Sequence, residues 1–114
     1  MQNNDKKLIE IIFSYCKKIE NCQILLKEET ESVKEMKYDL VSFYILQIGE
    51  TVKNLTEEFQ NKHKEVEWHK IKGMRNVIVH NYGAINTVRV ELTVEKKIPL
   101  LKAFCLRFLN KDEK

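Results

Sequence analysis

The chain contains few of the residues that interrupt helices. Its 114 residues include three glycines and a single proline, and 32% of them are charged. A sheet of many short strands needs turns, and Gly and Pro are among the residues that form turns most readily. The shortage of both therefore argues against such a sheet. Frequent Lys, Glu, Leu and Ile favour long helices instead, so the composition predicts an all-α fold.

Long apolar segments are also missing from the sequence. No apolar run approaches the roughly 18 residues that a membrane-spanning helix requires. Residues 1–7 are mostly polar and lack the apolar segment of a secretory signal. We therefore expect a soluble, cytoplasmic protein with no membrane partner.

Cysteine usage argues against two further classes of protein. The three cysteines, Cys16, Cys22 and Cys105, are odd in number and form no Cys-x-x-Cys pair. This pattern argues against a disulfide framework and against a zinc site. Each cysteine lies among apolar residues within an expected helix, so we expect all three to be small buried residues. The net charge of +3 is mild, and it permits nucleic-acid contact without requiring it.

Helical periodicity indicates two long helices in the first half of the chain. The first should span about 5–27, with Asp5 as its N-cap, and the second about 32–62 or 37–62. In both, apolar side chains recur at alternating spacings of four and three residues, which trace one face of a helix. These side chains are Leu8, Ile12, Tyr15, Ile19, Cys22 and Leu26, then Val41, Ile45, Ile48, Val52, Leu55 and Phe59. Gly49 lies inside the second helix, where glycine is unfavourable, so it indicates close packing against a neighbour.

Two further helices are expected in the second half of the chain. The third should span about 68–80. The fourth should begin at Asn86 or Thr87, each of which could serve as its N-cap. Pro99 should kink this helix or split it near Lys97, because proline has no amide hydrogen to donate.

The pattern as a whole predicts a helical bundle. Residues 88–94 alternate between apolar and polar as a strand would, but the apolar periodicity continues as far as Phe108 and favours a helix. We expect one all-α domain over 1–114, built as an up-and-down bundle of four or five helices.

One segment carries the clearest chemical signal, and it reads Arg75-Asn76-Val77-Ile78-Val79-His80-Asn81-Tyr82. On an ideal helix Arg75 and His80 lie about 140° apart, so they would not reach each other within one helix. Asn76 and His80 are four residues apart and would share a face. A complete site would then be formed by two copies of the chain, whose motifs face each other across a dimer axis.

These residue types suit chemistry on a phosphodiester. His80 could transfer protons near neutral pH, and Arg75 could hold a phosphate through two hydrogen bonds. Asn76 could orient His80 or contact the phosphate. No acidic cluster lies near the motif to hold a metal ion, so the natural reaction is RNA cleavage through the 2′-hydroxyl, without metal or cofactor. The other histidines, His63 and His69, lie in polar surroundings and are expected at the surface.

Several segments, in matching order, resemble the HepT-like toxins, a branch of the HEPN superfamily. The motif from Arg75 to Tyr82 matches the RX4HXY pattern of that family. Residues 48–55 resemble its IGE-x-x-K-x-L segment, residues 66–76 its W-x-x-I-x-G-M-R-N segment, and residues 98–101 its late L-P-x-L turn. Together these segments cover roughly 40–102, and several ordered motifs are far more specific than an isolated Arg–His spacing.

The resemblance implies both a fold and a function. HEPN proteins are α-helical bundles that dimerise through the motif helix, so that both motifs line one cleft. HepT-like members are ribonuclease toxins encoded beside a small nucleotidyltransferase antitoxin of the MNT type. Arg75 and His80 would then be catalytic, Asn76 would support them, and Tyr82 would contact RNA and accept AMP from the antitoxin. The added phosphate brings negative charge and bulk into a cationic cleft and would block RNA.

Two other functions fit the same residues. A non-catalytic HEPN adaptor would bind a nucleotidyltransferase, nucleotides or both, and would not cut RNA. A simple helical dimerisation module would use Arg75 and His80 only at a helix end, where the helix dipole favours cations.

Overall fold

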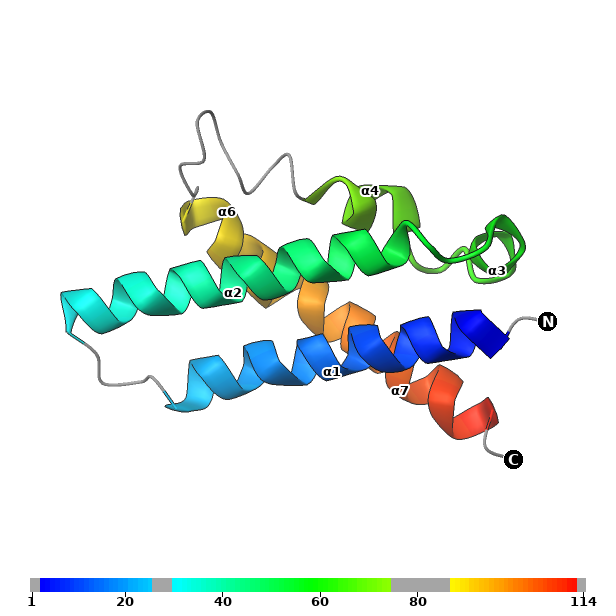
Figure 1. Ribbon diagram of the computed structural model, residues 1–114, viewed down its shortest axis with the longest axis horizontal. Helices are drawn as coiled ribbons and strands as arrows, with labels where there is room; N and C mark the ends of the chain where they lie inside the picture. The colour runs from blue at the N-terminus through cyan, green and yellow to red at the C-terminus, as the bar shows by residue number, and fades with distance from the viewer. Residues whose placement is uncertain (1–2, 26–29, 75–86, 113–114) are drawn as a thin grey trace.

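The computed structural model describes residues 3–25, 30–74 and 87–112 (Figure 1). In chain order its elements are α1 (Asn3–Leu25), α2 (Glu31–Val52), α3 (Glu57–Lys62), α4 (Trp68–Lys72), α6 (Thr87–Leu92), the π-helix η2 (Thr93–Lys97) and α7 (Ile98–Asp112). These ranges contain no strand, and residues 88–94 are helical. The predicted all-α bundle is therefore confirmed.

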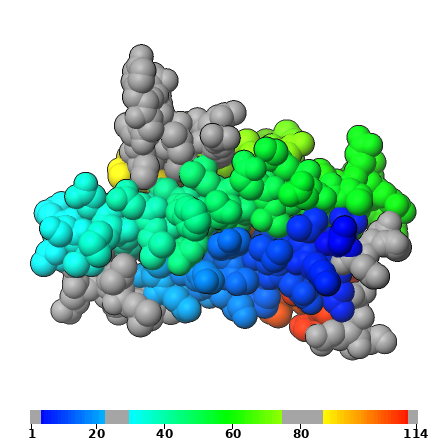
Figure 2. Space-filling view, viewed as in Figure 1, coloured from blue at the N-terminus to red at the C-terminus, as the bar shows by residue number. Residues whose placement is uncertain are grey.

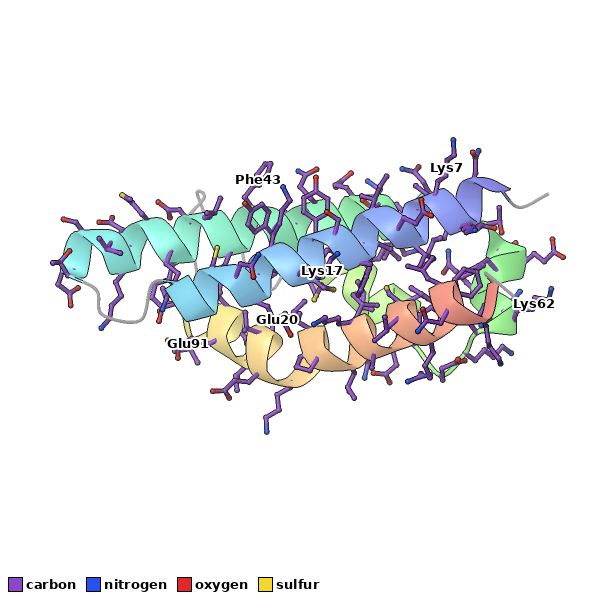
Figure 3. The ribbon with its side chains drawn as sticks, turned by 90° about the horizontal axis from the view of Figure 1, so that it is seen from below. Lys7, Lys17, Glu20, Phe43, Lys62 and Glu91 are labelled. Carbon is purple, nitrogen blue, oxygen red and sulfur yellow. The ribbon has the colours of Figure 1, made fainter. Side chains whose placement is uncertain are left out.

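The helices are arranged in two layers. α1 and α2 run antiparallel, side by side, and form the face seen in Figures 1 and 2. The chain from α6 through η2 to α7 crosses behind this pair, and Figure 3 shows it on the far side. α7 packs on α1, whereas α4 and α6 both pack on α2. One helix, α2, therefore supports the elements on either side of residues 75–86.

The core is shared by α1, α2 and α7. Its fully buried side chains include Ile9, Ile12, Cys16 and Ile19 of α1, Ile45, Ile48 and Val52 of α2, and Cys105 of α7. In α2 these positions match the predicted apolar face. In α1 the buried face also includes Ile9 and Cys16, while Leu8 and Tyr15 are only half-buried. This wider apolar face follows from packing, because α1 contacts both α2 and α7.

No helix in the described ranges combines the length and the apolarity that crossing a bilayer demands. All three cysteines are buried and free, as predicted.

Asp5 does not cap α1 as the sequence predicted, but ties α1 to the turn that follows α2. It lies in the first turn of α1 with only 1% of its surface exposed. Its carboxylate accepts two hydrogen bonds from Thr56, one from the backbone amide at 2.9 Å and one from the hydroxyl at 2.7 Å. The Thr56 hydroxyl oxygen in turn accepts a bond from the Phe59 amide at 3.1 Å and so caps α3.

This turn makes the predicted continuous helix over 32–62 or 37–62 wrong. The chain leaves α2 after Val52 and becomes helical again only at Glu57. The apolar periodicity nevertheless continues across the break, because Leu55 and Phe59 are both buried in the same core. Periodicity alone could not reveal a turn that is fixed by a carboxylate on another helix.

Pro99 lies at the predicted break in the last helical stretch. The π-helix η2 ends at Lys97, and α7 begins at Ile98. A proline at this position cannot donate an amide hydrogen, and its ring would collide with the carbonyl of Glu95 in a regular α-helix. A wider π turn just before the proline relieves that collision. The predicted split near Lys97 is therefore confirmed.

We predict that Asp5→Ala lowers the free energy of unfolding by about 2 kcal/mol, since two hydrogen bonds to a charged acceptor are lost. Urea unfolding followed by circular dichroism measures the change. Glu10→Ala, at an exposed position of the same helix, is the control and should change stability by less than about 0.5 kcal/mol. Equal urea midpoints for the two variants would show that the Asp5–Thr56 contact is not important for stability.

Candidate functional site

The four predicted site residues lie outside the described residues: Arg75, Asn76, His80 and Tyr82. The structure instead describes the frame that carries segment 75–86. α4 leads into the segment through Gly73 and Met74, and α6 follows it directly at Thr87. Of the predicted helix over 68–80, the described part is helical from Trp68 to Lys72. The contacts of this frame fix the residues that precede and follow the segment.

A very close contact between α2 and α4 fixes the start of the segment. A Cβ placed on Gly49 of α2 would lie 3.3 Å from the carbonyl oxygen of Ile71 and 3.5 Å from that of Lys72. A Cβ at this distance from Ile71 would be tighter than most real contacts, so the α4 backbone would have to move by a few tenths of an ångström. Ile71 and Met74 are both buried on this side of α4. The close helix packing predicted from Gly49 is confirmed, and it occurs three residues before Arg75.

Trp68 anchors the other end of α4. Its side chain is 4% exposed, and its indole Nε1 donates a hydrogen bond to the carbonyl of His63 at 2.9 Å. Its ring packs against Phe59 and Phe104, with centroid distances of 5.9 and 5.5 Å. A satisfied, buried indole in an aromatic cluster holds its helix firmly. α4 is therefore fixed at both ends before the chain enters the motif.

The two histidines expected at the surface behave differently. His69 is exposed, as predicted. His63 is half-buried instead, and its ring lies 4.5 Å from that of Phe59 and 5.5 Å from that of Phe108. These rings come from α3 and α7 and surround a residue whose neighbours in sequence are polar. Phe59 is only four residues away, but the rings of α7 that complete the burial are distant along the chain, so sequence context could not reveal it.

The end of the segment is held by the same helix as its start. α6 buries Val90 and contacts α2, and the Tyr38 hydroxyl of α2 donates a hydrogen bond to the Glu91 carboxylate of α6. Beside this bond lies a cavity of about 240 Å³ lined by residues of α2, α6 and η2. Tyr38 and Gly49 are eleven residues apart on α2, which is about 16 Å along a helix axis. The helices on either side of segment 75–86 therefore both pack on α2.

The buried cysteines are unsuited to chemistry at neutral pH. Burial raises the pKa of the Cys16 thiol to about 12, against a small lowering by Lys102. Burial also raises the pKa of Cys105, and Cys16 beside it raises it further. Both thiols therefore stay protonated, whereas a thiol nucleophile or metal ligand must be ionised. Within ranges 3–25, 30–74 and 87–112, no three side chains of the metal-binding types lie together.

Comparison with known proteins decides the family. The model of the family described as "Ribonuclease HepT-like" matches residues 12–108, which includes α4, segment 75–86 and α6. The chain belongs to this family. The resemblance to HepT-like proteins of the HEPN superfamily, drawn from residues 40–102, is thus confirmed and extends into α1.

Curated relatives of the chain are named as ribonucleases. A protein of Caldanaerobacter subterraneus subsp. tengcongensis named "Putative RNase" is 41% identical over 66 residues, or 58% of this chain and 59% of that protein. The "Probable ribonuclease HepT" of Thermococcus cleftensis is 34% identical over 55 residues, or 48% of this chain and 50% of that protein. The chain thus spans about half to three-fifths of the length of these relatives. No solved structure matches the chain significantly.

We predict that Gly49→Val displaces α4, because a branched side chain would collide with the Ile71 carbonyl. The free energy of unfolding should fall by about 1–3 kcal/mol, the usual cost of overpacking. Trp68 is the only tryptophan, so the emission of the folded variant should shift to longer wavelength as α4 moves. Gly73→Ala is the control, since a Cβ there meets its neighbours at 3.5 Å or more. An unshifted emission for Gly49→Val would mean that α4 is not held by this contact.

Proposed function

We propose that the chain is a homodimeric, metal-independent endoribonuclease and the toxin of a toxin–antitoxin pair. The observation that carries the proposal is an RX4HXY motif in a chain of the HepT-like family, placed between two helices that are both anchored on α2. The packing of these flanking helices matters because proton transfer and charge stabilisation depend on closely controlled distances. The relatives' names support the class of reaction.

The proposed residues have separate tasks in cleavage through the 2′-hydroxyl. The 2′-oxygen attacks the adjacent phosphorus and loses its proton to a base, while the 5′-oxygen leaves and takes a proton from an acid. The products are a 2′,3′-cyclic phosphate and a free 5′-hydroxyl. Arg75 binds the phosphate and stabilises the charge that develops on its oxygens, and Asn76 supports the site. DNA lacks the attacking hydroxyl and would not be cut.

Two proton carriers suit this reaction better than one, and one motif contains a single histidine. In the proposed dimer His80 acts on one side of the phosphate and His80 of the partner subunit acts on the other. The described residues next to the motif support an interface there. Val88 and Leu92 of α6 are apolar yet 65% and 42% exposed, immediately after segment 75–86. A second copy would cover them.

Tyr82 is the proposed point of control. A nucleotidyltransferase antitoxin of the MNT type would attach AMP to its hydroxyl, and the added phosphate would compete with RNA for Arg75. The pairing of toxin and antitoxin follows from the family resemblance.

We predict that Arg75→Ala and His80→Ala each reduce RNA cleavage at least about 100-fold, the low end of what a proton-transferring group contributes. Cleavage of labelled RNA is measured with EDTA present, which should leave the rate of the wild type unchanged. His69→Ala, an exposed histidine on α4, is the control and should cleave normally. Equal cleavage by all four proteins would contradict the assignment. No cleavage by any of them would favour the adaptor function, in which the motif binds without cutting.

We predict that incubation with the cognate nucleotidyltransferase and ATP adds AMP to the wild type and not to Tyr82→Phe. Intact-mass spectrometry detects the increments. Tyr44→Phe is the control, because Tyr44 is half-buried against Tyr15 and Phe43 and should not affect modification. Equal increments on Tyr82→Phe would place the acceptor elsewhere.

A further inference from the structure

A groove runs between α4 and the last helical stretch of the chain. Its first part has a volume of about 490 Å³ and lies between residues 64–71 on one side and η2 with the first half of α7 on the other. A second hollow of about 380 Å³ adjoins it towards the end of α7 and shares Glu65, Phe104 and Arg107 with the first. We call these two adjoining hollows together the α7 groove.

Positive charge is concentrated along the α7 groove. Its basic lining residues are Lys64, Lys70, Lys96, Lys97, Arg107 and Lys111. Only two acidic residues, Glu65 and Glu67, join them, which leaves an excess of four positive charges. The whole chain carries +3, so the excess in this one groove exceeds that of the complete molecule.

Most of these cations are available to a ligand. Lys70 pairs with Glu67 at 3.3 Å, and both side chains are more than half exposed, so this bond is weak and easily exchanged. The other five basic side chains form no ion pair within the described residues. By contrast Lys102, on the α1 side of α7, is bonded to Glu20 at 2.7 Å. An anionic polymer would therefore find unpaired cations in the groove.

The floor of the groove is apolar and partly aromatic. Leu100 is 74% exposed in it, and the half-buried rings of His63 and Phe108 line its second part. A charged rim with aromatic faces below is the arrangement that binds single-stranded nucleic acid, because phosphates contact the cations while bases stack on rings. An RNA duplex hides its base faces and would not use such a floor.

The elements that line the groove adjoin the motif along the chain. α4 supplies Lys70 and leads to Arg75, while η2 supplies Lys96 and Lys97 and follows α6, which begins directly after segment 75–86. We infer that the α7 groove binds the single-stranded RNA that extends from the scissile phosphate, and so selects unpaired RNA of several nucleotides over short fragments. This inference rests on the proposed ribonuclease function for its biological meaning, but the binding itself can be measured separately.

The binding experiment uses the full chain and a fluorescein-labelled 12-nucleotide 2′-O-methyl RNA, which has no free 2′-hydroxyl and cannot be cut. Fluorescence anisotropy at several salt concentrations compares the wild type with Lys97→Ala/Arg107→Ala. Loss of two phosphate contacts should lower the slope of log affinity against log salt by about 1.4, or roughly 25-fold in affinity at 0.1 M salt. Lys7→Ala/Lys17→Ala removes the same charge from α1 (Figure 3) and should change affinity less than twofold. Equal losses in both variants would overturn the assigned site.

Phe108→Leu tests the stacking part separately. It keeps an apolar side chain but removes the ring, so the affinity should fall about fivefold or more while the salt slope stays the same. Urea midpoints confirm that each variant is folded. Unchanged affinity would show that bases do not stack on this ring and would reduce the site to phosphate binding, contrary to the inference.

A comparison of RNA cleavage with RNA binding distinguishes this inference from the proposed function. If Arg75→Ala and His80→Ala cut RNA normally while Lys97→Ala/Arg107→Ala loses binding of the 12-mer, RNA binding by the α7 groove is supported and the catalytic assignment is wrong. If the motif variants are inactive while the groove variant binds like wild type, the opposite holds. Active groove variants should also cut a dinucleotide at the normal rate.

The groove could instead be covered by a second copy of the chain, and light scattering tests this by measuring the molar mass in solution. If the groove variant changes from dimer to monomer, the groove is an interface between copies and the inference is wrong.

Discussion

The close contact of Gly49 with the end of α4 is the constraint on which the arrangement of the site depends. A Cβ at this point would lie 3.3 Å from the carbonyl oxygen of Ile71, four residues before Arg75, and would press on it. Because backbone atoms of both helices meet here, the distance between α4 and α2 can change little. Trp68 then fixes the opposite end of the short helix through one hydrogen bond and an aromatic cluster. A five-residue helix has little stability of its own, so its position comes from these contacts.

α2 can serve as a platform because it is itself held by the core. Ile45, Ile48 and Val52 are fully buried in the core, and α1, α4 and α6 all pack on this helix. The Asp5–Thr56 contact closes the end of this platform by joining the first turn of α1 to the turn after α2. Apolar burial and a few long-range polar contacts thus hold the motif-bearing segment at both of its ends. α4 also lines the α7 groove with Lys70 and Ile71, so the short helix that precedes the motif in the chain forms part of the proposed RNA path.

Much of the fold could be predicted from the sequence, because a helix that lies on a core repeats its apolar residues at the period of the helix. The face of α2, the split near Pro99 and the packing role of Gly49 were all predictable from local chemistry. The predictions were wrong where a distant partner decides the structure. Asp5 meets Thr56 across 51 positions, and His63 is covered by rings from α7. The candidate catalytic residues came from spacing and family motifs, whereas nothing local indicated the frame that holds them.

The sequence by itself determined the helical class, the family and the chemical identity of the motif, because these depend on residue types and on spacings within single helices. Only the tertiary structure decided where α2 ends, how α4 and α6 are mounted on it, and that six cations from separate segments line one groove. The groove's walls come from residues 64–71 and 96–111, which are about 30 positions apart and share no periodic signal. Charged residues from distant segments form a binding site only when packing brings them together. Local sequence patterns do not encode the packing between distant segments.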